Sequence, residues 1–400
     1  MKQILTVLLC FFSLGAGFAQ SVTLEPYWNS GLKFKSEDER YQFSVGGRVH
    51  FDYIYQQHGA HLDTIFEPIG ERIQIRRARI NFSGTLDDFI EYDFEFNFGE
   101  TFNYGDMYIA FLRVPLLDRI TIGYLREPFG MEEQTNANRL VFMERSLTNA
   151  IGTGRNVGIR LEKHHFDDKF SAYAGINRLT NNLIEDVSGE GSYSLTTRLV
   201  YSPLLQEELN RAVHLGISGG TYSPINNTYQ LESQNEAEVN VMYVQTPELE
   251  QVRQVRRVAG EAGYTAGQFS MQAEYMHAFA EQVEQASKVT HDFSSYYILG
   301  SYFLSGGSRK YRRSNTNFSS IQLEERSEEN KLRGAWEIGL RFSSINTSSV
   351  QPDFGVLKNL SLGLNWYFTS SSRLMLNMMR GKLQSNHTIQ ALQFRAQVSF

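Results

Sequence analysis

Arginine side chains recur at every second position in parts of this sequence, a spacing that could build a surface for binding oxyanions. Arg77 and Arg79 alternate with Ala78, Ile80 and Phe82, the two-residue period of a β-strand. Each guanidinium offers a rigid fork of donors suited to planar or tetrahedral oxyanions, and rings of Arg or Lys line anion pores. The same alternation predicts seven arginines on the polar faces of strands: Arg48, Arg77, Arg79, Arg160, Arg198, Arg341 and Arg395.

Carboxylates share these polar faces and compete with any anion for the arginines. Alternation predicts eight of them: Asp52, Glu91, Asp93, Glu95, Glu162, Glu261, Glu274 and Glu337. The polar surface is therefore close to neutral, and structural pairing is the commoner role for a single arginine. A strong local field still arises if the two signs segregate in space.

A segment of about thirty residues, 127–154, interrupts the alternating pattern between two strands. Apolar residues such as Phe129 and Phe142 give it groups to bury, and a connection of this length in a compact fold is usually functional or disordered. Its flanking and internal charges alternate in sign, with arginines at Arg126, Arg139, Arg145 and Arg155 and glutamates at Glu127, Glu132, Glu133 and Glu144. We expect it to fold into a barrel and narrow the pore; the alternative is an outer cap packed on neighbouring loops.

The carboxy-terminal thirteen residues show the clearest strand. Leu392 and Phe394 fall on one face, Gln393 and Arg395 on the other, and the chain ends on Phe400. An apolar strand face needs lipid or a core to cover it. On this segment alone, an edge strand of a soluble sandwich remains an alternative to the closing strand of a membrane barrel.

Charges in mid-strand decide between these alternatives. Glu91, Asp93 and Glu95 alternate with aromatic residues, and charges at such positions cannot face lipid without a cost in free energy. They must face water inside a barrel. The sequence therefore predicts an all-β fold, a transmembrane antiparallel β-barrel with a long pore-constricting loop.

Composition agrees with a barrel. The 400 residues include 28 Phe and 21 Tyr but only 8 Pro, and the mean hydropathy is -0.36. Alternating lipid-facing and lumen-facing residues cancel in such an average, and few prolines suit a chain that mostly donates to a hydrogen-bond ladder. A formal net charge of -6 makes nucleic acid an unsuitable partner.

About sixteen segments show strand-like alternation, and an even number places both ends of the barrel on one side of the membrane. They lie near residues 41–55, 73–83, 90–98, 104–114, 118–126, 155–163, 168–177, 192–202, 211–222, 255–265, 268–279, 292–304, 333–344, 358–368, 372–382 and 388–400. Periplasmic turns are predicted at Asp87–Asp88, Pro115–Asp118, His164–Asp168 and Ser370–Ser372. An extra strand-like piece, Val239–Gln245, is interpreted as an outer hairpin because counting it would break the parity. The polar stretch 305–332 does not fit the pattern, and alternation gives no physical account of it.

The amino terminus predicts export. Lys2, an apolar core from Ile4 to Leu14 and small residues up to Ala19 are typical of a signal peptide. Its removal would take away Cys10, the only cysteine, and with it any disulfide, thiolate ligand or thiol nucleophile. The predicted organisation is a signal peptide at 1–19, a periplasmic N-terminal segment at 20–39 and a transmembrane barrel at 40–400 that contains the constriction loop 127–154.

Enzymatic and metal-binding motifs are weak. His164 and His165 fall at a predicted turn, and the sequence lacks a nucleophile elbow, a phosphate-cradling glycine loop and a zinc-ligand helix pattern. Glu132 and Glu133 could contact calcium, but without ligand spacing they are more typical of a solvated face. We predict no enzyme activity, no cofactor and no metal.

Several motifs carry a family resemblance that covers nearly the whole chain. They are Gly46-Gly47-Arg48 with Asp52, the Arg76–Arg79 run closing on Gly84, Glu127-Pro128-Phe129, and Phe142-Met143-Glu144-Arg145-Ser146 leading to Gly154-Arg155 and Gly158. In these motifs the sequence resembles the phosphate-selective porin O and P family. The resemblance implies a sixteen-stranded, trimeric barrel with a loop folded into the pore. It also implies arginines along an anion path: Arg48, Arg77 and Arg79 on the wall and Arg126, Arg145 and Arg155 at the loop.

With Arg139 in the loop and Arg160 on the following strand, these residues are the predicted pore-lining set. The predicted function is passive diffusion of small hydrophilic solutes, with anions such as phosphate or polyphosphate, through the outer membrane of a Gram-negative bacterium. Expected partners are outer-membrane lipid and lipopolysaccharide, two further copies of the chain, and the barrel assembly machinery, which would read the strand ending in Phe400. The alternatives are an outer-membrane barrel enzyme, such as a lipid or ester hydrolase, and a structural or adhesive barrel.

Overall fold

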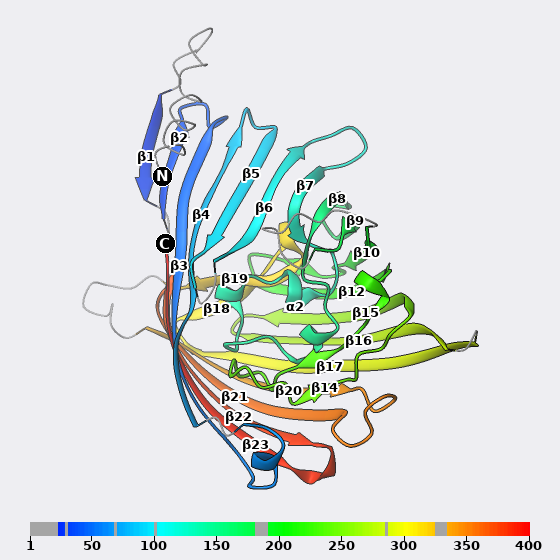
Figure 1. The fold of residues 1–400 in the computed structure, drawn as a ribbon. Helices are drawn as coiled ribbons and strands as arrows, with labels where there is room; N and C mark the ends of the chain where they lie inside the picture. Colours follow the sequence, from blue (N-terminus) through cyan, green and yellow to red (C-terminus); the bar gives the residue numbers. More distant parts are fainter. Residues whose placement is uncertain are drawn as a thin grey trace, which may run out of the picture.

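Sixteen antiparallel strands close into a β-barrel in the computed structural model (Figure 1). The structure describes residues 23–28, 31–67, 70–99, 102–180, 191–284, 287–324 and 334–400, so the predicted signal peptide lies outside the described residues. The barrel strands are β3 (Gln42–His58), β4 (Gly70–Leu86), β5 (Ile90–Asn97), β6 (Asn103–Leu112), β7 (Arg119–Arg126), β8 (Arg155–His165), β9 (Phe170–Arg178), β10 (Tyr193–Tyr201), β12 (Arg211–Tyr222), β15 (Val252–Ala266), β16 (Phe269–Glu284), β17 (Ser287–Ser305), β20 (Ala335–Asn346), β21 (Val356–Thr369), β22 (Ser372–Leu383) and β23 (Thr388–Ser399).

The predicted segments coincide with these sixteen strands, which confirms the fold class. The largest boundary difference lies between β16 and β17, where pairing continues to Glu284↔Ser287, beyond the predicted ends at 279 and 292. Apolar side chains such as Ile73, which is 82 % exposed, point outward in mid-strand, and polar side chains such as Asp52 and Arg395 point inward. Near the loop end, apolar residues such as Ile54 and Val255 are also buried on the inner face. A closed barrel satisfies every strand edge, which is what a hydrocarbon environment requires of the backbone.

The seam joins the carboxy-terminal strand to the first barrel strand. Strand β23 pairs with β3 from Ile389↔His58 to Ser399↔Arg48. Beyond the last pair, Phe400 and Gly47 exchange two backbone hydrogen bonds of 2.9 and 2.8 Å. The terminal residue therefore completes the ladder.

A short hairpin lies beside this seam. Its strands are β1 (Leu24–Trp28) and β2 (Leu32–Ser36), and β2 pairs with the first residues of β3, from Leu32↔Val45 to Lys35↔Gln42. The hairpin continues the wall past the carboxy terminus. It accounts for most of the segment 20–39 that the sequence predicts to be periplasmic.

The predicted short turns all lie at one end of the barrel, which we call the turn end. The Ser399 amide donates to the Ser371 carbonyl at 2.7 Å, so the β21–β22 turn lies beside the carboxy terminus. Arg40 forms an ion pair with Asp87, so the β4–β5 turn lies beside the start of β3. The opposite end, the loop end, carries the longer connections apart from the one between β17 and β20.

That exceptional connection contains the polar stretch 305–332, of which residues 325–332 lie outside the described residues. Strands β18 (Gly307–Arg312) and β19 (Asn317–Leu323) form a hairpin that enters the barrel from the turn end (Figure 1). Its Tyr311 and Phe318 pack against Met131 and against Ala212 of the wall. Because both faces of the hairpin meet the barrel interior, neither face had to be apolar, and its sequence shows no simple alternation.

The connection 223–251 also folds inward. Strands β13 (Glu232–Ser233) and β14 (Val244–Gln245) form a two-residue ladder, so the predicted hairpin is present, but only the end of Val239–Gln245 is a strand. Val239 and Tyr243 are buried in a core cluster with wall residues. The piece therefore packs inside the mouth of the barrel.

Substitution of Gly47 should destabilise the seam. A Cβ at this position would lie 2.6 Å from the Phe400 ring and 2.7 Å from the Arg79 carbonyl oxygen, whereas a Cβ at Gly300 would meet nothing within 4 Å. We expect Gly47→Ala to lower the free energy of unfolding by about 1–3 kcal/mol through overpacking and Gly300→Ala to leave it nearly unchanged. The urea midpoint of barrel unfolding, followed by gel mobility, measures both. Equal midpoints for the two variants would contradict the tight seam.

Candidate functional site

Residues 127–154 run inside the barrel, from the end of β7 to the start of β8. They include α2 (Met131–Gln134), η2 (Ala137–Arg139) and η3 (Leu147–Ala150). Phe142 is buried against Tyr297 and Leu299 of β17, and the Arg341 guanidinium lies 4.4 Å from its ring centre. The apolar residues of the segment are thus buried by the inner wall, and the alternative of an outer cap is wrong.

Buried carboxylates hold both sides of α2. Glu274 of β16 accepts the backbone amides of Met131 and Glu132 at 2.9 and 2.7 Å, and the Tyr297 hydroxyl at 2.7 Å. Glu127 accepts from the side chains of Asn156, Ser194 and Thr196. Free amides at a helix start favour a negative partner, so the Glu274 contact fixes the entry of the segment.

The carbonyls of the segment bind arginines of the far wall, which we define as β20 to β23. Arg395 donates to the Met143 carbonyl at 2.6 Å, Arg341 to that of Glu144 at 3.0 Å, and Arg373 to that of Leu140 at 2.8 Å. Arg395 also forms an ion pair with Asp52, and Arg341 with Glu236. These guanidiniums are occupied by the inserted segment and by carboxylates.

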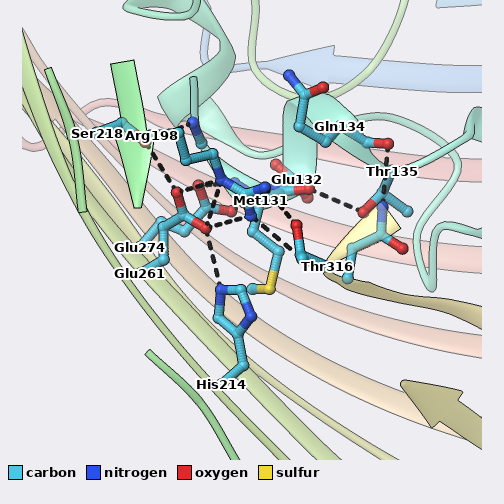
Figure 2. A network of polar contacts seen from close by, with 12 residues as sticks. Met131, Glu132, Gln134, Thr135, Arg198, His214, Ser218, Glu261, Glu274 and Thr316 are labelled. Carbon is cyan, nitrogen blue, oxygen red and sulfur yellow. Dashed lines mark hydrogen bonds and ion pairs between the residues drawn. The ribbon is translucent and has the colours of Figure 1, made fainter. Parts of the chain in front are cut away.

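A second network holds the tip of the inserted hairpin (Figure 2). Arg198 binds Glu261 through two nitrogens at 2.9 and 2.7 Å and donates to the Thr316 hydroxyl at 2.6 Å. His214 lies 3.1 Å from the same carboxylate. On the β20 side of the hairpin, Arg309 pairs with Glu337 at 2.9 Å. Of the eight predicted lumen acids, Asp52, Glu261, Glu274 and Glu337 therefore serve to anchor inserted segments.

The near wall, β3 to β8, has a different charge pattern. Arg48 and Arg79 are cross-strand partners and both bond to Glu95, the Arg79 contact measuring 2.5 Å. Arg155 binds the two oxygens of Asp106 at 2.9 and 3.3 Å. Arg48 also reaches the segment 127–154, where it donates to the Asn136 side-chain oxygen at 2.7 Å.

The inserted segment adds a shared carboxylate from its own side. Glu133 lies 3.3 Å from Arg126 and 3.4 Å from Arg145. Arg145 also donates to the Thr135 carbonyl at 2.8 Å, which fixes its position within the segment. The calcium alternative for Glu132 and Glu133 is not supported, because Glu132 accepts from Ser146 and faces Arg341.

Arg77 differs from its neighbours. Among the described residues it forms no hydrogen bond or ion pair, its Nε is buried without an acceptor, and the partly exposed side chain lines a cavity of the lumen. The charges of Arg76, Arg79 and Glu144 act on it. Its donors remain available to a solute.

A β-bulge explains why sequence alternation missed Arg76. The pairing of β3 with β4 shifts between His50 and Phe51, so that His50 faces Arg77, Phe51 faces Ile75, and Arg76 has no partner. Arg76 and Arg77 both reach the lumen, and Arg76 binds Glu144 through two contacts of 3.1 Å and Glu238 at 3.0 Å. The sequence signal for this bulge was the pair of adjacent arginines, Arg76 and Arg77, because strict alternation would place one of them in lipid.

Six predicted arginines thus form one positive band, which we define as Arg48, Arg77, Arg79, Arg126, Arg145 and Arg155. Their mutual electrostatic contacts include Arg48 with Arg77, Arg155 and Arg126. Three carboxylates, Glu95, Glu133 and Asp106, bond to five of the six arginines, all except Arg77, and the six arginines therefore keep a formal excess of three positive charges. Asp93 lies close enough to act on Arg48 and Arg155 and reduces that excess to two.

Two cavities border the band. One of about 360 Å³ is lined by Arg76, Arg77, Glu144 and Glu238 on the loop-end side. The other, about 350 Å³, is lined by residues that include Arg126 and Arg160 and faces the inserted hairpin. The band therefore lies between two polar spaces.

The remaining predicted residues lie outside the band. Arg160 binds Glu162 at 2.7 Å on the turn-end side, beside the Arg119–Glu91 pair at 2.6 Å. Arg139 lies apart, donating to the Ser370 carbonyl at 2.7 Å at the turn between β21 and β22. Sequence reasoning also missed Arg119, Asp106 and the anchoring residue Glu236.

Two carboxyl groups on the loop-end side titrate differently. Burial raises the pKa of Glu238 above its ordinary value, and the charge of Glu144 raises it further. Burial also opposes ionisation of Glu144, but the charges of Arg76 and Arg395 outweigh it and hold the pKa of Glu144 well below its usual range. On acidification the first proton of this pair therefore goes to Glu238.

Comparison with known proteins places the chain in a family. A family model described as "Phosphate-selective porin O and P" matches residues 43–400. The chain belongs to the phosphate-selective porin O and P family. It is accordingly an outer-membrane β-barrel porin of Gram-negative bacteria, and porins are channels and not enzymes.

Individual relatives are distant. Porin O of Pseudomonas aeruginosa is 22% identical over 404 residues, covering 88% of this chain and 85% of that protein. The outer membrane channel DcaP of Acinetobacter baumannii has a TM-score of 0.59 at 11% identity, over 92% of this chain and 99% of that one. An anion-selective porin from Comamonas acidovorans has a TM-score of 0.55 at 11% identity, over 90% and 100%. These structures share the fold.

Acidification should increase the preference of the pore for anions. Protonation of Glu238 removes one of the two carboxylates on Arg76, so the anion-to-cation permeability ratio should rise as pH falls from neutral through the raised pKa of Glu238. Glu238→Gln should show the higher ratio already at neutral pH and lose this step. Reversal potentials in a salt gradient measure the ratio, with the exposed Glu248→Gln as the control. A step that persists in Glu238→Gln would assign it to another group.

Proposed function

We propose that this porin conducts small hydrophilic anions by passive diffusion and prefers oxyanions such as phosphate. The observation that carries the proposal is the positive band, in which only three carboxylates accompany six arginines. Fixed charges of one sign in a narrow, low-dielectric passage concentrate the opposite ion. The predicted lumen charges sum to nearly zero, but this total is compatible with an anion path because half of the predicted lumen carboxylates anchor inserted segments.

Arg77 is the proposed contact for the solute. Its neighbours are held by Glu95, Glu133 and Asp106, whereas Arg77 has no bonded acceptor among the described residues. A guanidinium with free donors can bind an oxyanion through two parallel hydrogen bonds. The description of the family as phosphate-selective, and the name of the anion-selective porin from Comamonas acidovorans, agree with an anionic solute.

The remaining parts of the proposal concern assembly. We infer that residues 1–19 are a signal peptide and that the strand ending in Phe400 is read by the barrel assembly machinery. A homotrimer is supported by the fold shared with OmpT of Vibrio cholerae, which has a structure described as a trimer form, at a TM-score of 0.53 and 10% identity. The loop 127–154 is proposed to constrict the path because it borders the band on the side opposite the near wall.

Conductance of the purified protein in planar bilayers tests the channel. We expect ohmic channels whose reversal potential favours anions, and Arg77→Glu with Arg79→Glu should shift the reversal potential towards cations without preventing insertion. Absence of channels would reject conduction by this chain. A preference of the wild-type pore for cations would reject the anion path, and loss of insertion in the double variant would make these arginines structural.

Phosphate block of chloride current tests Arg77 itself. One lost charge-assisted contact of about 1.5–3 kcal/mol weakens binding at least about tenfold, so Arg77→Gln should raise the half-blocking phosphate concentration by that factor. The exposed Arg253→Gln, which removes a charge outside the band, should leave it unchanged. Equal block in wild type and Arg77→Gln would exclude Arg77 as the phosphate contact.

A further inference from the structure

We propose that the outer wall of the barrel carries a site for a phosphorylated, multiply acylated lipid of the outer leaflet. The site combines an apolar groove across β20 to β23 and β3 with three cations at its loop-end edge, Lys358, Arg380 and Lys382. It is separate from the pore and does not depend on the solute that the pore conducts.

The groove has a volume of about 590 Å³. Its apolar lining includes Leu340, Leu360, Leu362, Met378 and Leu392, which are 38–55 % exposed. These side chains belong to the outward faces of the strands, so the groove is continuous with the lipid-facing surface. Acyl chains are the natural occupants of an apolar hollow on such a surface.

The apolar surface ends at the same level on neighbouring strands. Going towards the loop end, Leu360 is followed by Lys358 on β21, Met378 by Arg380 on β22, and Leu392 by Gln390 on β23. Gln390 bonds Gln57 of β3 at 3.1 Å. This polar edge marks where lipid headgroups meet the barrel.

The three cations lie together at that edge. Lys358 is the cross-strand partner of Lys382, and Arg380 is the partner of Leu360, two residues further along β21. Among the described residues, none of the three forms an ion pair or a side-chain hydrogen bond. Like charges placed directly opposite destabilise a strand pair unless something neutralises them.

Another part of the same loop-end edge has cations that are paired with a carboxylate. On β16 and β17, Glu281 binds Lys288 at 2.6 Å and also interacts with Arg256 and Arg253. Cations there are balanced by a carboxylate of the protein. At Lys358, Arg380 and Lys382 no described carboxylate forms an ion pair, so these three cations are available to an external anion.

A phosphorylated membrane lipid fits both halves of the site, the cations and the apolar groove. Lys and Arg bind phosphate through charge-assisted hydrogen bonds, and the groove directly below takes the chains of the same molecule. A free phosphate would use only the cations, and a second copy of the chain would need acidic groups facing them. The juxtaposition of groove and cations therefore favours a phosphorylated lipid.

Native mass spectrometry of the whole protein with purified diphosphoryl lipid A tests the site. Each basic residue near an anionic lipid headgroup contributes about fivefold in affinity, so Lys358→Gln, Arg380→Gln and Lys382→Gln together should weaken binding about 100-fold. Lys288→Gln should bind as wild type. Met378→Trp, which fills the groove but keeps the cations, should also weaken binding.

Controls separate the alternatives. Dephosphorylated lipid A should bind weakly, and pyrophosphate at equal concentration should not displace the lipid. Unchanged lipid binding in the triple variant, or equal binding of the dephosphorylated lipid, would overturn the proposal. So would cross-linking of Leu362→Cys to a second copy, because the face would then be an interface between protomers. Single substitutions tested separately keep the proposal falsifiable if the triple variant fails to fold.

Discussion

The charge pattern of this pore depends on how buried carboxylates fix the segment 127–154. Glu274 accepts two backbone amides at the start of α2, and Glu127 is held by three side chains of β8 and β10. Inside a barrel these contacts have little competition from water, so an unmade bond would be costly. The segment therefore has one defined position, with its carbonyls directed at the arginines of the far wall.

That position separates the charges. Glu261 on β15 and Glu337 on β20 neutralise arginines that hold the inserted hairpin, and Glu274 on β16 accepts backbone amides of the segment 127–154. The arginines of β3 to β8 are left with fewer partners, and Arg77 with none among the described residues. A wall that is nearly neutral in total thus has a positive band, bordered by the pairs of Arg76 and Arg119.

Much of this architecture could be predicted from residue order. Strand number and the lipid-facing side of each strand follow from alternation and from the cost of placing charges in lipid. The errors have local physical causes. A bulge at Arg76 changed the phase of β4. The β18–β19 hairpin and residues 231–249 lie inside the barrel, so neither has a lipid-facing side that would mark a strand by alternation. Arg139 was grouped with the pore arginines because its position in the segment gave no direction for its side chain.

The sequence by itself determined the closed barrel. Alternation is a property of each strand, and a hydrocarbon environment leaves few other ways to satisfy the hydrogen bonds of the backbone. It also determined which side chains are inside. Only the tertiary structure decided which inward charges neutralise each other. Arg198 and Glu261, or Arg395 and Asp52, are far apart in the chain and meet through register and closure. Alternation within a strand shows how many charges lie on one face. Which charges form ion pairs depends on distances between strands and between the wall and the inserted segment.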